Sequence, residues 1–396
     1  MNHVIDSDRH IEEPLDLWTT RMSPQFRDRA PRPADPKGDP YFFSFDGEIT
    51  PSKSHYAHRA LRTSFTRADE ARYALARADG FGPTSQLQTM DVEGIDLAVM
   101  FPTRGLYVAG IVGHDNALMN DAARAYNDWL ADFCRAGQGR LLGVGMLNLR
   151  DPEGAAAETR RCIERLGFVG MFARPNRQGA PFFDESYDPL WSLLQDLQTP
   201  VCFHEGNAVP LPQAGADRFT KHGMWHVCTH PMENQMAMVE LVLGGVLERH
   251  PGLKAGFLEC GAGWLPYWMW RLNEADELDH DHDFPYLTMP PSHYIKRQCF
   301  VSIDSDEDTG PFALGRLGGR HVIWGSDFPH DDGKYPNGLK LLRGLDGMTD
   351  EFANQVLWHN PLEFYNPRLR ETAGALTPSR RSGQDLPSPA AAGEGC

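Results

Sequence analysis

Eight short apolar segments recur along the chain, and each ends in polar or small residues. They cover residues 3–8, 96–102, 140–149, 168–175, 200–206, 253–261, 298–304 and 321–329. Their apolar residues run almost continuously instead of alternating with polar ones, which is typical of strands buried on both faces of a parallel sheet.

Segments with helical spacing of apolar residues lie between these strands. Residues 115–135 and 150–167 are examples, and Asp115 and Asp151 are placed to cap the first turns of the two helices. Eight strand–helix alternations predict an α/β fold, a (β/α)8 or TIM barrel. A doubly wound parallel sheet is the alternative.

Two regions do not follow the strand–helix repeat. Residues 19–92 form a long insertion after the first predicted strand, rich in arginine and aromatic residues, which could close over a site as a lid. Residues 372–396 are rich in Pro, Gly, Ala and Ser and are predicted to be disordered. Residues 1–371 therefore form one predicted barrel domain.

The composition limits the class of protein. A formal charge of −16 disfavours nucleic-acid binding, which needs a basic surface. The seven cysteines are dispersed without a Cys-x-x-Cys pair, and several lie inside apolar segments, which favours reduced core thiols in a cytoplasmic protein. No signal peptide is apparent, and no apolar run reaches the length that spans a membrane.

Histidines and carboxylates gather where the predicted strands end. In a (β/α)8 barrel, these C-terminal strand ends form the active-site face. The candidate metal ligands there are Asp8, His10, Glu13, His204, Glu259, Asp327 and His330, and His230 is a further candidate ligand or substrate contact. Several carboxylates within a few ångströms would raise each other's pKa steeply, and bound cations remove that penalty.

Each of these residues alone also has a structural explanation. A single histidine at a strand end is more often a hydrogen-bonded core group than a ligand, Asp327 could cap a turn, and Glu13 could be a solvated loop acid. Their joint placement on one barrel rim favours a metal centre. Of the neighbours Glu12 and Glu13, the second is expected to point inward because Pro14 holds it extended.

Four segments carry a resemblance to a known family. VIDSDRHIEEP (4–14), PVCFHEG (200–206), ECGAGWLPY (259–267) and WGSDFPHDD (324–332) look like the signature segments of the amidohydrolase-related family, which includes aminocarboxymuconate-semialdehyde decarboxylase and aromatic-acid decarboxylases. The resemblance covers residues 3–366 and implies a metal-dependent TIM barrel. It maps the family's metal ligands to Asp8, His10, His204 and Asp327.

The sequence departs from the family pattern in two places. Members with one zinc commonly carry His-x-His on the first strand, where this chain has Asp8 and His10, and the sixth strand ends in Glu259 and Cys260 in place of a functional histidine. One divalent ion among four carboxylates would leave a local charge of about −2, whereas two ions would bring it to about zero. Mixed carboxylate and imidazole ligands suit iron or manganese better than zinc.

This ligand set resembles a branch of the family described as TIM-barrel nonheme diiron monooxygenases. The resemblance implies two Fe ions, dioxygen as co-substrate and an external electron donor. It also implies hydroxylation of an unactivated C–H bond of a CoA-linked small molecule in secondary, terpenoid metabolism. Asp327, Glu259 and His204 are the expected catalytic residues.

The insertion bears on the substrate. Its residues 53–79 contain six Lys and Arg residues, and Arg59, Arg62 and Arg67 are predicted to bind the phosphates of a CoA thioester, because arginine makes bidentate contacts with phosphate. A helix with a solvated basic face is the alternative explanation.

Two other functions stay open from the sequence. An enzyme with one Zn or Mn ion could be a hydrolase or a nonoxidative decarboxylase, in which Asp327 orients or deprotonates a metal-bound water or the metal chelates an acid substrate. A non-catalytic barrel that binds a small ligand is the least favoured, because so many ionisable groups are costly without metal. The oligomeric state is undecided, and a homo-oligomer is one option.

Overall fold

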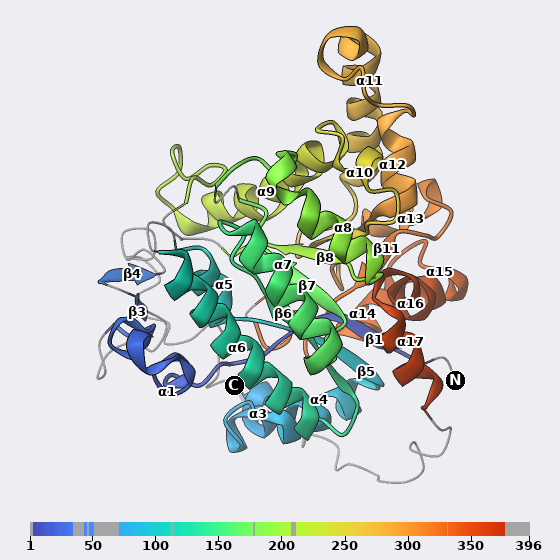
Figure 1. The fold of residues 1–396 in the computed structure, drawn as a ribbon. Coiled ribbons are helices and arrows are strands. Elements are labelled where there is room, and N and C mark those ends of the chain that lie inside the picture. The colour runs from blue at the N-terminus through green and yellow to red at the C-terminus, as the bar shows by residue number, and fades with distance from the viewer. Residues whose placement is uncertain are drawn as a thin grey trace.

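A sheet of eight parallel strands forms the centre of the molecule (Figure 1). The structure is a computed structural model that describes residues 3–34, 43–45, 47–50, 71–111, 115–176, 179–206, 211–330 and 332–376. The strands are β1 (Ile5–His10), β5 (Leu97–Phe101), β6 (Leu141–Met146), β7 (Gly170–Ala173), β8 (Val201–His204), β9 (Ala255–Leu258), β10 (Cys299–Ile303) and β11 (Val322–Trp324). All of their residues are buried, which explains the nearly continuous apolar runs in the sequence.

The seam between β1 and β11 closes this sheet into a barrel. The backbone N–H of His10 donates to the carbonyl oxygen of Phe328 at 2.7 Å, and the N–H of Asp327 donates to the carbonyl oxygen of Asp8 at 3.0 Å. Glycine is required at position 325, because an added Cβ there would lie 2.4 Å from the Cβ of Asp8. The predicted (β/α)8 barrel is confirmed, and the doubly wound alternative is wrong.

Helices cover the outside of the barrel (Figure 1). They are α5 (Arg104–Ala109), α6 (Asn116–Ala136), α7 (Pro152–Arg161) with η3 (Cys162–Leu166), η4 (Glu185–Tyr187), α8 (Asp188–Asp196), α9 (His222–Val242), α10 (Val246–Arg249), α11 (Leu265–Asp283), α12 (Pro291–Gln298), α13 (Gly310–Arg316), α14 (Gly338–Gly344), α15 (Asp350–Asn354), η5 (Gln355–His359), α16 (Asn360–Phe364) and α17 (Pro367–Gly374). Asp115 and Asp151 cap α6 and α7 as predicted, by accepting from the N–H groups of Leu118 and Gly154. Within the described part of the chain, no helix is both long and apolar enough to cross a membrane.

The connection from β1 to β5 contains the insertion. It holds α1 (Leu17–Arg21), η1 (Pro24–Arg29), a small antiparallel sheet of β2 (Arg32–Pro33), β3 (Phe43–Phe45) and β4 (Glu48–Thr50), η2 (Ala71–Tyr73), α3 (Ala74–Ala78) and α4 (Pro83–Glu93). Helix α4 packs against α6 and leads into β5, so it belongs to the helical layer of the barrel. The insertion is therefore shorter than the predicted range 19–92, and its role as a lid stays a prediction.

The two ends of the predicted barrel domain can be compared with the structure. Helix α17, which Asn366 caps and whose first turn holds Pro367, continues to Gly374, three residues beyond the predicted domain end at 371. Residues 377–396, which hold most of the tail predicted to be disordered, lie outside the described residues.

The end of the insertion packs on the loop that follows β11. Tyr73, Ala76, Phe81, Phe328 and Tyr335 form a separate cluster of buried side chains. The Tyr73 hydroxyl donates to the main-chain oxygen of His330 at 3.2 Å. Residues 71–81 thus hold the backbone of the loop that carries two of the candidate ligands.

Candidate metal centre

Seven of the eight predicted metal ligands lie together at the C-terminal end of the barrel. Asp8 and His10 come from β1, His204 from β8, Glu259 from the residue after β9, Asp327 and His330 from the loop after β11, and His230 from α9. Their ligand atoms form overlapping groups within 4.8 Å, namely Asp8 with His10 and His204; His10 with Glu259, Asp327 and His330; and His226 with His230 and Glu259. The predicted convergence of these side chains is thus present in the structure.

The imidazoles of His10 and His204 point their Nε2 lone pairs toward each other. The Nδ1 of His10 lies 2.7 Å from the carbonyl oxygen of Pro102, and the Nδ1 of His204 lies 2.7 Å from that of Glu205. Carbonyl oxygens only accept hydrogen bonds, so both Nδ1 atoms carry the ring proton and both Nε2 atoms carry lone pairs. The two Nε2 atoms are 3.1 Å apart. Burial lowers the pKa of His10, which favours this neutral form.

The carboxylate of Asp8 adds negative charge beside these lone pairs. Its Oδ1 lies 3.4 Å from His10 Nε2, and its Oδ2 lies 3.5 Å from His204 Nε2. Asp8 Oδ1 is buried and accepts no hydrogen bond from any residue that the structure describes. An anion and two lone pairs at these distances fit a bound cation, which would ligate all three groups.

Asp327 and Glu259 have unusual backbone conformations. Their φ angles are 52° and 49°, in the left-handed region that non-glycine residues rarely adopt. Such strain costs about 1–3 kcal/mol and is concentrated at functional sites. Burial and the neighbouring carboxylates raise the pKa of both side chains well above the usual range. Backbone strain and the burial of neighbouring carboxylates thus both raise the free energy of this arrangement, and bound cations would offset the electrostatic part.

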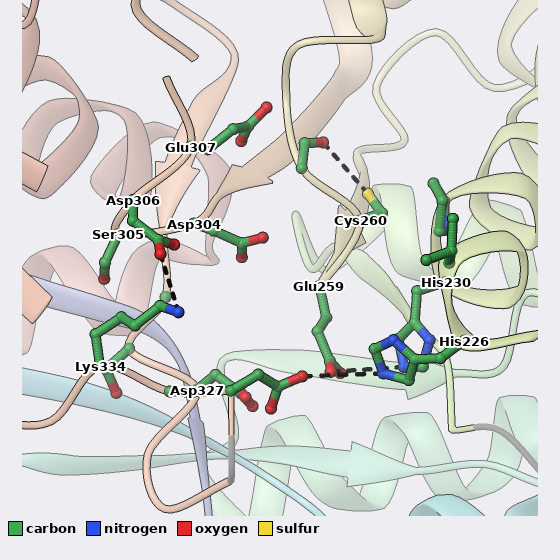
Figure 2. A pocket seen from close by; sticks show the side chains of 17 residues that line it. His226, His230, Glu259, Cys260, Asp304, Ser305, Asp306, Glu307, Asp327 and Lys334 are labelled. Carbon is green, nitrogen blue, oxygen red and sulfur yellow. Dashed lines mark hydrogen bonds and ion pairs between the residues drawn. The ribbon is translucent and has the colours of Figure 1, made fainter. Parts of the chain in front are cut away.

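Glu259 lies between two groups of imidazoles, and Figure 2 shows the group formed by His226 and His230. Its Oε2 lies 3.2 Å from His204 Nε2, and its Oε1 lies 3.5 Å from His230 Nε2. The ring of His226 stacks against that of His230 at 4.3 Å between centroids, and His226 Nε2 lies 3.9 Å from Asp332 Oδ2. The geometry therefore accommodates one ion beside His10 and His204 and a second beside His230, with Glu259 shared.

Glu13 does not join this cluster. As expected, its side chain points inward and is buried, but its carboxylate accepts from the backbone N–H groups of Thr103, Arg104 and Gly105 at 3.2, 2.8 and 2.9 Å. These amides begin α5, where unpaired N–H groups attract an anion. The prediction that Glu13 is a metal ligand is therefore corrected, because the amides at the start of α5 bind its carboxylate.

Two further residues of the site, Thr103 and Asp332, were missed, and three predicted ones lie outside the described residues. The sequence gave no signal for Thr103 or Asp332, since a threonine or an aspartate after a strand reads as a turn or cap residue. The predicted phosphate ligands Arg59, Arg62 and Arg67 lie outside the described residues.

A buried arginine, also missed, holds the chain that follows β8. Arg174 donates through Nη2 to Glu205 Oε1 at 2.7 Å and to the carbonyl oxygen of Gly206 at 2.5 Å, and through Nη1 to that of Leu106 at 2.7 Å. These bonds fix the peptide whose oxygen binds His204, so Arg174 supports the orientation of that imidazole.

A cavity of about 330 Å³ opens beside the cluster (Figure 2). Its wall includes Glu259, Asp327 and Asp332 from the centre, Asp304, Asp306 and Glu307 from the loop after β10, and His226, Val227, His230 and Pro231 from α9. Lys334 is the only Lys or Arg among the described residues that line it, and its Nζ lies 2.9 Å from Asp306 Oδ2. The cavity is strongly acidic and reaches three of the candidate metal ligands, His230, Glu259 and Asp327.

Known proteins resemble this chain along most of its length. A family model described as amidohydrolase matches residues 5–366. The 2-amino-3-carboxymuconate-6-semialdehyde decarboxylase of Dictyostelium discoideum is 26% identical over 282 residues, which make up 71% of this chain and 76% of that protein.

Solved structures share the fold. Amidohydrolase map2389c from Mycobacterium avium subsp. paratuberculosis K-10 superposes with a TM-score of 0.74 at 21% identity, over 92% of this chain and 99% of that one. A dihydroxybenzoic acid decarboxylase from Polaromonas sp. JS666, with bound manganese and the inhibitor 2-nitroresorcinol, gives a TM-score of 0.64 at 19% identity, over 92% and 97% of the two chains.

Glu13 should make the stability of the protein depend on pH. Burial raises its pKa to about 7, so the folded state binds its proton more tightly than the unfolded state does. The stabilisation is complete below the unfolded value near 4.5 and is lost as the pH rises through 7. We expect Glu13→Gln to remove on the order of 1–3 kcal/mol of the decrease in unfolding free energy between pH 4.5 and 8, measured by urea denaturation. Equal pH profiles for wild type and variant would contradict this prediction.

Proposed function

The chain belongs to the amidohydrolase family, and from this premise we propose that it is a metal-dependent decarboxylase of a small aromatic or conjugated carboxylic acid. One observation carries the proposal. The Nε2 lone pairs of His10 and His204 face each other beside the Oδ1 atom of Asp8, which accepts no hydrogen bond from the described residues, and an open cavity lies next to this group. The names of two similar proteins, both decarboxylases, support the reaction type.

The residues of β1, β8 and β11 fit one divalent ion. The distances of 3.1–3.5 Å between the facing ligand atoms of Asp8, His10 and His204 are close to the spacing of about 3 Å expected for ligands around one ion. Asp327 would complete the set, since its Oδ1 lies 3.3 Å from His10 Nε2. Manganese or iron suits these ligands, and manganese is present in the similar Polaromonas structure. When bound, the ion supplies positive charge that holds and polarises the substrate's carboxylate and adjoining oxygen.

The reaction sets the tasks of the protein side chains. The C–C bond to the carboxylate breaks, its electron pair stays on the remaining carbon, carbon dioxide leaves, and the carbon takes a proton. Glu259 and Asp327 line the cavity, so either can hold that proton at an oxygen that faces the substrate. His204 orients the ligand set through its bond to the Glu205 carbonyl.

The acidic wall of the cavity restricts the substrate. Asp304, Asp306 and Glu307 would repel a second anionic group, and the one lysine of the wall is already paired with Asp306. The favoured substrate therefore carries its single carboxylate toward the metal ligands and neutral hydrogen-bond donors, such as hydroxyl groups, toward this wall. The CoA thioester predicted from the sequence would have to keep its phosphates outside this cavity, and its binding by Arg59, Arg62 and Arg67 stays a prediction.

A nonheme diiron monooxygenase, the function first expected from the sequence, is the second candidate. It is favoured by one observation, the position of Glu259 between His204 and His230, which would let two ions share one carboxylate. The names of the similar proteins favour the decarboxylase instead. A hydrolase with one ion stays an alternative within the same family.

Anaerobic turnover separates the two candidates. Protein loaded with Mn²⁺ or Fe²⁺ should release carbon dioxide from a dihydroxybenzoic acid or from 2-amino-3-carboxymuconate-6-semialdehyde without oxygen, with one ion per chain sufficient. Asp327→Asn is the control and should lose at least about 100-fold in rate because it removes a candidate ligand and proton carrier. Oxygen uptake that needs two Fe per chain, with no anaerobic carbon dioxide, would overturn the decarboxylase and support the second candidate.

Metal affinity should distinguish Asp8, a candidate metal ligand, from Glu13, which caps helix α5. Asp8→Asn should weaken Mn²⁺ binding by about 100-fold or more, because it removes an anionic ligand, whereas Glu13→Gln should change it by less than about threefold. Isothermal titration of metal-free protein measures both. Similar losses for the two variants would contradict the assignment of Glu13 to helix α5.

A further inference from the structure

Thr103 occupies the first cap position of α5, but its hydroxyl does not cap the helix. A threonine at this position usually accepts a hydrogen bond from the amide two or three residues further on. The structure has no such bond from Thr103, although the residue is fully buried. Its hydroxyl is therefore available for a different contact.

Glu13 takes over the capping. Its carboxylate accepts from the amides of Thr103, Arg104 and Gly105, and the Gly105 amide is one that a capping hydroxyl of Thr103 would otherwise bind. The Thr103 hydroxyl instead lies 3.0 Å from Nε2 of His330. Glu13 thus binds the start of helix α5, and the Thr103 hydroxyl contacts His330 of the candidate centre.

The other nitrogen of His330 faces the candidate ligands. Its Nδ1 lies 2.7 Å from Asp327 Oδ1, and that oxygen is buried and accepts no hydrogen bond within the described part of the chain. The 2.7 Å contact is not aligned as a hydrogen bond, so Nδ1 does not donate to Asp327. In the neutral ring the proton is then on Nε2, and the Thr103 hydroxyl, which can either donate or accept, is the acceptor there, so the lone pair of Nδ1 points inward. The ring of His330 also packs against that of His10, with centroids 3.9 Å apart.

We propose that Thr103 is a positioning residue that fixes the tautomer and orientation of His330, so that Nδ1 is presented to the metal centre. This inference rests on the proposed metal-dependent function and adds a residue that holds the centre in place. It repeats the arrangement at His10 and His204, whose outer nitrogens donate to the oxygens of Pro102 and Glu205. Ligating histidines commonly need such an outer acceptor.

The backbone of His330 is held from a different side. Tyr73 of the insertion donates to the main-chain oxygen of His330, whereas Thr103 comes from the end of β5. Loss of the Thr103 hydroxyl should therefore free the ring while the main chain stays in place. This separation makes a specific effect on the imidazole measurable without loss of the fold.

The test compares Thr103→Val, which keeps the size but removes the hydroxyl, with Thr103→Ser, which keeps the hydroxyl. Thr159→Val is the matched control, because Thr159 is also fully buried but its hydroxyl makes no hydrogen bond. We expect Thr103→Val to weaken Mn²⁺ binding by about 10–100-fold and the other two variants to stay within about threefold of wild type. Thermal unfolding of each variant checks that the fold is retained.

A second readout needs no metal. Histidine-selective ¹⁵N NMR of the metal-free protein should show His330 protonated on Nε2 in wild type and Thr103→Ser, and a mixture of tautomers in Thr103→Val. Unchanged tautomer and unchanged affinity in Thr103→Val would overturn the proposal. If wild type binds no metal, the proposed function fails, while the NMR comparison still decides whether Thr103 sets the tautomer of His330.

Discussion

The closure of the barrel between β1 and β11 is the constraint on which the candidate centre depends. The same residues that exchange backbone hydrogen bonds across this seam, Asp8, His10 and Asp327, supply side chains to the cluster. The close approach at Gly325 leaves no room for a side chain between the two strands. The seam therefore sets the spacing of these ligands before any metal is bound, as a preorganised centre requires.

Around this seam, each imidazole is oriented by an oxygen on its outer side. The carbonyl groups of Pro102 and Glu205 fix His10 and His204, and the latter carbonyl belongs to a chain segment held by the buried Arg174. The two inward Nε2 atoms then contact each other, and Asp8 Oδ1 accepts no hydrogen bond from any described residue. Such an arrangement is costly in a protein interior unless a cation is present, which explains why so many ionisable groups share one barrel rim.

The sequence predicted the barrel well because its evidence is local. Strands buried on both faces need nearly continuous apolar runs, and each of the eight runs coincides with a strand, although β1 continues to His10, two residues beyond its run. The ends of these strands also placed six of the eight candidate ligands near one another, and His230, which joins them, lies on α9. Glu13 was misassigned because the N–H groups that bind it come from α5, about ninety residues further along the chain, and their approach is a tertiary event.

The choice of metal number and reaction had a weaker basis in the sequence. Counting carboxylates favoured two ions, but that count included Glu13, whose charge the helix start accommodates. It also omitted Asp332, which lies beside His226. Charge counting needs the spatial position of each acid, which local patterns do not provide.

The most direct test of the metal centre is an anomalous difference map from crystals of the protein grown with Mn²⁺. The account predicts a strong peak between His10 Nε2, His204 Nε2 and Asp8, with both Nδ1 atoms still bonded to the carbonyl oxygens. A map without such a peak, in which the two imidazoles bond to each other through a shared proton, would contradict it.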